Sequence, residues 1–208
     1  MRIPVATTLC CLLLICPLAY SSWACTSFCL DTPSGPVFGT NLDPLISVDG
    51  LVIVNPRGVA KKGVRKSSAG GRARWISKYG SVTFTLSGRE YVWSGINEAG
   101  VVLSSMQLRS GEHPEPDERP PVLHGRWAQY VLDTCASVDE ALQVESLVRI
   151  EGDDVPTDHY LVADAAGNCA AIEYIDGRYV YYTGESLPVK AMSNMRYGRA
   201  LFALEHGR

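Results

Sequence analysis

Cys25 and the bond before it could together produce a catalytic group. Ala24 ends the stretch "SSWA", and cleavage after it would leave Cys25 with a free α-amine beside its thiol. A free thiol has a pKa of about 8.5 and an α-amine one of about 7.7–8.0, so the amine is a suitable general base near neutral pH. Processing at this bond would therefore give Cys25 both the nucleophile and the base of an acyl-transfer site.

The residues before Cys25 have the pattern of a secretory signal. Arg2 precedes an almost wholly apolar run over residues 5–20. A membrane-spanning helix needs roughly 20 apolar residues, whereas the core of a signal needs about 7–15. Ser22-Trp23-Ala24 then gives the small-x-small pattern of a cleavage site. Cleavage one or two residues away, or an uncleaved anchor, are the alternatives.

The composition is that of an ordinary globular protein. Hydrophobic residues make up 46% and charged residues 20%, and the formal net charge is −3, so a nucleic-acid partner is not expected. We predict a signal peptide over residues 1–24 and one domain over residues 25–208. The product would be periplasmic or secreted, with no stable membrane anchor after cleavage.

The cysteines and histidines suggest neither a disulfide scaffold nor a metal site. In an oxidising compartment, one disulfide bond could form between two of the residues Cys29, Cys135 and Cys169. The spacing Cys25-x₃-Cys29 has no second pair, so no metal or other cofactor is predicted. A papain-type pairing of Cys25 with His159 is the weaker alternative to the amine as base.

The strands that would position Cys25 can be read from the pattern. "CTSFCLD" and "PVFGTNLD", joined by "TPSG", predict a hairpin that begins at Cys25. "GLVIVNPRG" predicts a buried strand, and the basic residues 57–74 predict a solvated, mobile loop. "GSVTFTL", "EYVWSGINE" and "GVVLSSMQL" predict an antiparallel meander, with Asn97 to Gly100 as a turn in which Gly100 has positive φ.

Two helices and a second meander follow. After a proline-rich surface loop over residues 111–121, apolar residues fall on one face of a helix over residues 122–135. Ser137 and Glu140 form a capping-box pattern that begins a second helix. Three strands, a short strand "VKAMSNM" and a terminal helix "YGRALFALEH" complete the chain. This order predicts an α+β layered fold with largely antiparallel sheets.

Four motifs resemble those of a known family. "CTSFCL…GTNLD", "GINEAGVV", "HYLVADAAGNCAAIEY" and "AMSNM" occur in the order and approximate spacing of the choloylglycine hydrolase and penicillin V acylase family, from Cys25 to about Tyr197. The resemblance is to members described as linear amide C–N hydrolases. It implies the four-layer αββα sandwich of N-terminal-nucleophile hydrolases, and cleavage of a small-molecule amide through an acyl-thioester. Penicillin V, conjugated bile acids and N-acyl amines are the candidate substrates.

The resemblance also implies roles for four residues. Cys25 would be the nucleophile, and Asp43 the acidic residue that orients its amine and thiol. Asn194 would line the oxyanion hole, and the Gln107 amide falls near a second oxyanion position. Ordinary structural roles are the alternatives: a buried cysteine at position 25, a turn cap at Asp43 and a satisfied sheet edge at Asn194.

Two departures from the family bear on activity. Thr40 stands where the family usually has a basic residue, three positions before the aspartate. Family members also generally continue beyond the end of this sequence, with further strands and an active-site arginine, so a partial domain is expected. Exposed sheet edges would then favour weak stability or association between copies.

Two alternatives to an active enzyme follow from these residues. One is an inactive exported remnant or binding protein of the same fold, which Thr40 favours. The other is a lipoprotein acylated at Cys25, which Ser22 and Trp23 disfavour because a lipobox has an apolar residue at the first of these positions.

Overall fold

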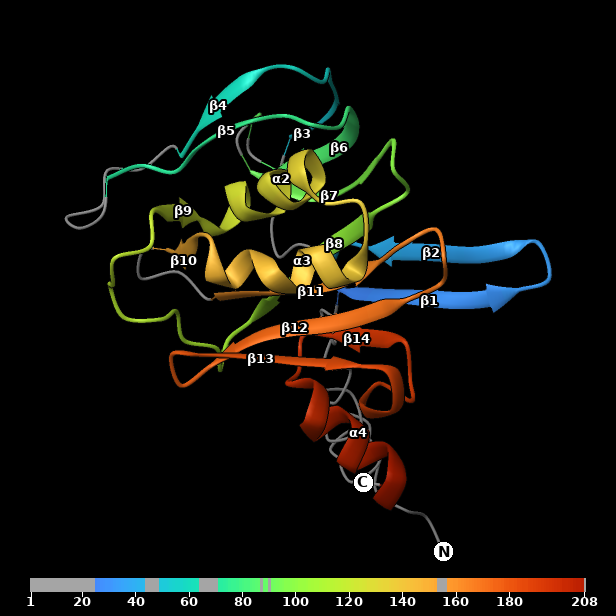
Figure 1. Cartoon of the computed structure of the whole chain (residues 1–208). Helices are drawn as coiled ribbons and strands as arrows, with labels where there is room; N and C mark the ends of the chain where they lie inside the picture. The colour runs from blue at the N-terminus through green and yellow to red at the C-terminus, as the bar shows by residue number, and fades with distance from the viewer. Residues whose placement is uncertain are drawn as a thin grey trace, which may run out of the picture.

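The computed structural model describes residues 25–43, 49–63, 71–86, 88–89, 91–152 and 157–207. The predicted signal peptide lies outside these residues. The family resemblance predicted helices and sheets in layers, and Figure 1 shows two helices lying over one face of a large sheet, with a second sheet behind it.

A seven-stranded antiparallel sheet forms the centre of the fold, in the order β13-β12-β11-β8-β7-β6-β3. The two predicted meanders meet in it, because β8 pairs with β11 along seven residues. The strands are β3 (Gly50–Asn55), β6 (Ser81–Leu86), β7 (Val92–Asn97), β8 (Val102–Leu108), β11 (Thr157–Ala163), β12 (Cys169–Ile175) and β13 (Arg178–Thr183).

Helices α2 (His124–Thr134) and α3 (Val138–Gln143) cover one face of this sheet, and short 3₁₀ turns occupy Val144–Ser146 and Gly184–Ser186. The fully buried Trp127 and Leu132 of α2 pack on the sheet. The close approach needs Gly95, because a Cβ there would lie 2.8 Å from a Leu132 methyl group.

The first helix begins later than predicted. Residues before His124 form β9 (Pro121–Leu123), which pairs in parallel with β10 (Arg149–Glu151). The predicted cap of α3 is confirmed, since the Ser137 hydroxyl accepts the Glu140 N–H at 3.2 Å.

Local turn chemistry is also confirmed at the β7–β8 hairpin. The Asn97 side-chain oxygen accepts the N–H groups of Ala99 and Val101, and Gly100 has a φ of 89°. The Asn97 amide nitrogen donates to two carbonyl groups at the end of α2, so the turn also ties the sheet to the helix.

The second sheet, in the order β14-β1-β2, carries the N-terminal hairpin. It consists of β1 (Thr26–Thr32), β2 (Gly35–Asn41) and β14 (Ala191–Ser193), all antiparallel. Figure 1 shows the blue β1–β2 hairpin extending past the end of the large sheet. Cys29, Met106, Leu161 and Met192 share the core between the two sheets.

Helix α4 (Tyr197–His206) follows β14, close to the end of the described chain. Its buried Tyr197 packs on Tyr182 of β13, with ring centroids 4.8 Å apart. The molecule is therefore an α+β sandwich with mostly antiparallel sheets, as predicted. In the described part of the chain, no helix is both long enough and apolar enough to cross a membrane.

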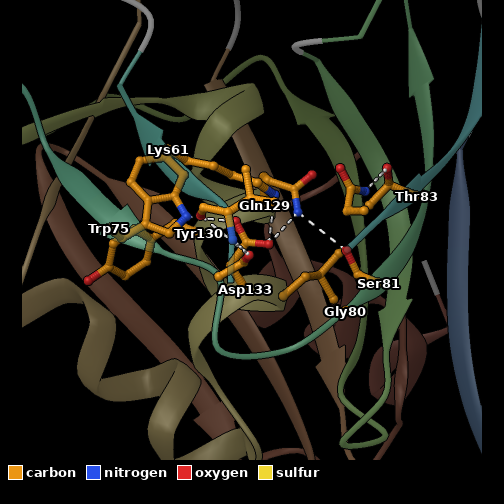
Figure 2. A network of polar contacts seen from close by, with 12 residues as sticks. Lys61, Trp75, Gly80, Ser81, Thr83, Gln129, Tyr130 and Asp133 are labelled. Carbon is orange, nitrogen blue, oxygen red and sulfur yellow. Dashed lines mark hydrogen bonds and ion pairs between the residues drawn. The ribbon is translucent and has the colours of Figure 1, made fainter. Parts of the chain in front are cut away.

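The basic stretch over residues 57–74 is not simply a loop. Ala60–Lys62 (β4) and Arg74–Ile76 (β5) form an antiparallel ribbon, while residues 64–70 lie outside the described chain. Figure 2 shows how the ribbon contacts the helix: Lys61 and Trp75 converge on the fully buried Asp133 of α2, with hydrogen bonds of 2.8 and 2.6 Å. A buried ion pair that sequence pattern cannot reveal therefore attaches the ribbon to the helix.

The stretch "GLVIVNPRG" forms a strand as predicted, but the prediction that this strand is buried is wrong. The strand exists as β3, but among the described strands it lies at the edge of its sheet and pairs with β6 alone. Val52 and Val54 are 64% and 75% exposed. β-branched composition predicts extended backbone, whereas burial depends on whether another layer covers that part of the sheet.

Candidate active site

Cys25 lies at the head of β1, where the two sheets meet. Its main-chain nitrogen donates a hydrogen bond of 2.6 Å to the Asn194 side-chain oxygen, between residues 169 positions apart. The pairing of Thr26 with Ser193 on β14 brings the two residues together. Cys25 is 6% exposed, so its thiol borders the core between the sheets.

Asn194 uses both ends of its amide at this site. Its oxygen accepts from Cys25, and its nitrogen donates to the main-chain oxygen of Gln107 at 2.8 Å. A side-chain amide nitrogen has two N–H donors, so the second remains for another acceptor beside Cys25. An oxyanion formed at Cys25 would be such an acceptor, as the family resemblance implied.

Gln107 contributes its main chain rather than its side chain to the contact that the structure defines. The Gln107 carbonyl on β8 receives the Asn194 amide, and the Gln107 side chain is exposed. The sequence predicted an oxyanion donor at the Gln107 amide. The structure brings this residue to the site as the acceptor that fixes Asn194.

Asp43 lies at the correct end of the hairpin for a role at Cys25. Asn41 pairs with Thr26, and Asp43 lies two residues after Asn41. Asp43 is exposed, and no hydrogen bond joins its carboxylate to Cys25 within the described part of the chain. The structure thus brings Cys25, Asn194 and Gln107 together and leaves Asp43 beside them.

Residues 25–196 match the sequence profile of the linear amide C–N hydrolases, choloylglycine hydrolase family. The chain belongs to this family. It is 33% identical over 210 residues to penicillin V acylase from Pectobacterium atrosepticum, an alignment that covers 91% of this chain and 55% of the relative.

Solved structures show the same fold. Penicillin V acylase from Agrobacterium tumefaciens has a TM-score of 0.76 and 29% identity, covering 87% of this chain and 56% of that chain. A mutant of conjugated bile acid hydrolase from Clostridium perfringens has a TM-score of 0.72 and 18% identity, covering 88% of this chain and 57% of that chain. The chain spans little more than half the length of the relatives it matches.

Thr40, at the position where the family resemblance implied a basic residue, is a neutral hydrogen-bonding group. Its hydroxyl lies 3.0 Å from the Ser27 hydroxyl on β1 and 2.8 Å from the Ser104 hydroxyl on β8. These contacts tie the hairpin to the large sheet. Both contacts join neutral hydroxyl groups, so Thr40 brings no positive charge to this end of the hairpin.

His159 does not pair with Cys25. Its Nδ1 lies 3.0 Å from Glu173 Oε1, and its Nε2 has no hydrogen-bond partner among the described residues. The Glu173 carboxylate also accepts the main-chain N–H of Tyr197 at 2.9 Å. Sequence reasoning passed over Glu173, although an acidic residue inside the apolar strand "CAAIEYI" was a signal that it has a buried partner.

The other cysteines lie in two separate cores. Cys135 lies in the core under the helices, whereas Cys29 and Cys169 share the core between the sheets with Cys25. All four are free thiols. Burial, and then the neighbouring Cys29, raise the pKa of Cys169 to about 12. No group of three or more His, Cys, Asp or Glu side chains in the described chain is arranged to hold a metal ion.

A groove of about 520 Å³ lies beside the site, between β2 and the large sheet. Its lining is mainly apolar and includes Phe38, Phe84, Ile96 and Val102, with Thr40 at the boundary. Cys25 is not part of the lining. The groove therefore lies between β2 and the large sheet, apart from the Cys25 thiol.

Proposed function

We propose that this chain is a hydrolase of linear amides, with Cys25 as an N-terminal nucleophile. The hydrogen bond from the Cys25 nitrogen to Asn194 is the observation that supports this proposal most directly. We further propose that the chain is cleaved after Ala24 and exported; the family match begins at residue 25, the residue that this cleavage would expose. The proposed substrates are amides with an apolar or aromatic acyl group, because one relative is a penicillin V acylase.

The proposed first step forms an acyl-thioester. The Cys25 amine takes the thiol proton, and the sulfur attacks the amide carbon. The free N–H of Asn194 stabilises the oxyanion, while its bond to Gln107 holds the amide in place. The amine then gives the proton to the leaving nitrogen, and the C–N bond breaks. Water deprotonated by the same amine attacks the thioester and releases the acid, which restores the thiol.

Asp43 and the Asn194 oxygen would both orient the Cys25 amine in this mechanism. Cleavage after Ala24 changes the Cys25 nitrogen from a peptide N–H into an amine that keeps a donor for Asn194 and gains a lone pair for the thiol proton. The proposal therefore requires processing before activity.

A remnant that binds ligands without turnover is the second candidate. It is favoured by the neutral Thr40 contacts and by the uncovered apolar residues of β3. Such a protein would hold an amide at the same place without acylating Cys25.

The intact mass of the exported chain, before and after brief exposure to penicillin V, separates these candidates. We expect a mass that begins at Cys25 and one acyl adduct, absent in Cys25→Ala and retained in Cys135→Ser on the opposite face of the sheet. We also expect Asn194→Ala to lower the acylation rate by about 10²–10³-fold, the usual effect of losing an oxyanion donor. Binding of penicillin V without an adduct would favour the remnant, and a lipid on Cys25 would exclude the hydrolase.

A further inference from the structure

The segment that carries Asn194 has no regular structure of its own. β14 ends at Ser193 and α4 begins at Tyr197, so Asn194 lies in the short connection between them. Its amide makes both hydrogen bonds described above, to Cys25 and to Gln107. The position of the amide therefore depends on what fixes the two ends of the connection.

Glu173 fixes the end at which α4 begins. Its carboxylate on β12 is 1% exposed and accepts the Tyr197 N–H at 2.9 Å. The N-cap residue Arg196 gives α4 no side-chain cap. N–H groups at a helix N-terminus lack partners within the helix and lie at the positive end of the helix dipole. Glu173 thus provides from a neighbouring strand the acceptor that the local sequence does not.

His159 orients the Glu173 carboxylate. It precedes Tyr160 on β11, and Glu173 follows Ile172 on β12. Because Tyr160 pairs with Ile172 in antiparallel register, His159 and Glu173 lie opposite each other on adjacent strands. Its Nδ1 contacts the same oxygen that receives the Tyr197 N–H. Both side chains are buried on a sheet, where rotamer freedom is small. The acceptor for α4 is therefore attached to the rigid centre of the fold.

Tyr197 is also held by its buried ring, which packs on Tyr182, and by its hydroxyl, which exchanges hydrogen bonds with the main chain of Val189. Two further attachments of this region are exposed. Arg196 donates to the Ser110 hydroxyl and carbonyl, and Lys190 forms an ion pair with Asp31 at the surface. Exposed pairs contribute about 0–1 kcal/mol, whereas a buried N–H that loses its acceptor is costly. Loss of Glu173 would therefore matter more than loss of either exposed pair, because it leaves the buried Tyr197 N–H without its acceptor.

We propose that Glu173, oriented by His159, is a positioning residue that holds Asn194 beside Cys25. This inference rests on the proposed function for the role of Asn194. Removal of the carboxylate frees the start of α4, three residues after Asn194, and moves the amide from Cys25. A displacement of about 1 Å in a catalytic group can reduce the rate about 10²-fold.

Steady-state kinetics of three variants test the catalytic part of the proposal. We expect Glu173→Ala to lower kcat about 10- to 100-fold with KM changed less than about threefold, because the oxyanion donor acts on the transition state. Glu173→Gln keeps an oxygen that accepts the Tyr197 N–H, so its kcat should stay within about threefold. Asp31→Asn, which weakens the exposed pair with Lys190, is the matched control and should not change kcat.

Amide hydrogen exchange tests the same inference without turnover. We expect exchange at Tyr197 and in the connection before it to be about tenfold faster or more in Glu173→Ala. It should be unchanged in Glu173→Gln and in Asp31→Asn.

Each outcome supports or overturns the positioning role. Unchanged exchange in a folded Glu173→Ala variant would overturn it, as would faster exchange with wild-type kcat. A wild-type chain that is never acylated at Cys25 would instead reject the proposed function, and exchange would still decide whether Glu173 holds the connection.

Discussion

The two faces of the seven-stranded sheet are covered to different extents. Leu103, Tyr160 and Ile172 on the helix face are completely buried under α2 and α3. On the opposite face, the β14-β1-β2 sheet shares a core with β8, β11 and β12. Val54 of β3 and Phe84 of β6 are left 75% and 50% exposed on that face.

Strand register explains why the exposed residues form one surface. Val52 pairs with Phe84, and Val82 pairs with both Val54 and Ile96, so their side chains point to the same face. The groove beside β2 opens onto this surface. Burial of apolar area provides most of the folding free energy, at about 25 cal/mol per Å². The helix face thus has the larger buried core, while the other face carries the candidate site beside apolar residues that the described chain leaves exposed.

Trp127→Ala should have the largest effect on stability. Trp127, a residue of α2, is fully buried and packs on Tyr160, with ring centroids 4.4 Å apart. We expect the free energy of unfolding to fall by about 3–5 kcal/mol, measured by urea denaturation. A loss below about 1 kcal/mol would show that the helix face does not stabilise the fold in the way that its burial indicates.

The pH dependence of the free energy of unfolding tests whether His113 is partly buried as the structure indicates. Burial, and then the charge of His124, lower the pKa of His113 from 6.5 to about 4. Between these values the unfolded chain binds a proton at His113 that the folded chain does not, so stability should fall as the pH falls through this window.

His113→Phe keeps the ring that stacks on His124 but does not titrate. We expect the variant to lose less stability than the wild type between pH 6.5 and pH 4. The slope of its free energy of unfolding against pH should be smaller by the contribution of up to about one bound proton. Denaturation at several pH values measures this difference. Identical slopes in the two proteins would contradict a lowered pKa for His113.

Val54→Lys should have the smallest effect on stability and a clear effect on association. The side chain is exposed, so the free energy of unfolding should change by about 0.5 kcal/mol or less. We expect weaker binding of a hydrophobic dye and less light scattering, because a charge interrupts the apolar surface. Leu147→Lys, an exposed apolar site near α3, is the control and should not reduce either signal. Equal effects of the two variants would show that the uncovered surface is not where copies associate.

The elements that the sequence predicted correctly depend on nearby residues. The hairpin after Cys25, the cap at Ser137 and the turn at Asn97 each involve residues a few positions apart, and their backbone preferences and short-range hydrogen bonds are enough to define them. The family motifs likewise pointed to Cys25 and Asn194, which the fold brings together.

Tertiary structure alone decided the contacts that join distant segments. Sequence pattern does not show that β3 is uncovered, that Lys61 reaches Asp133, or that Glu173 holds the start of α4. A buried charge follows its partner, and the partner is set by which strands and helices become neighbours when the chain folds. The sequence by itself thus determined the nucleophile candidate and the local elements around it. Packing of distant segments determined which groups orient Asn194 and which face of the sheet remains open.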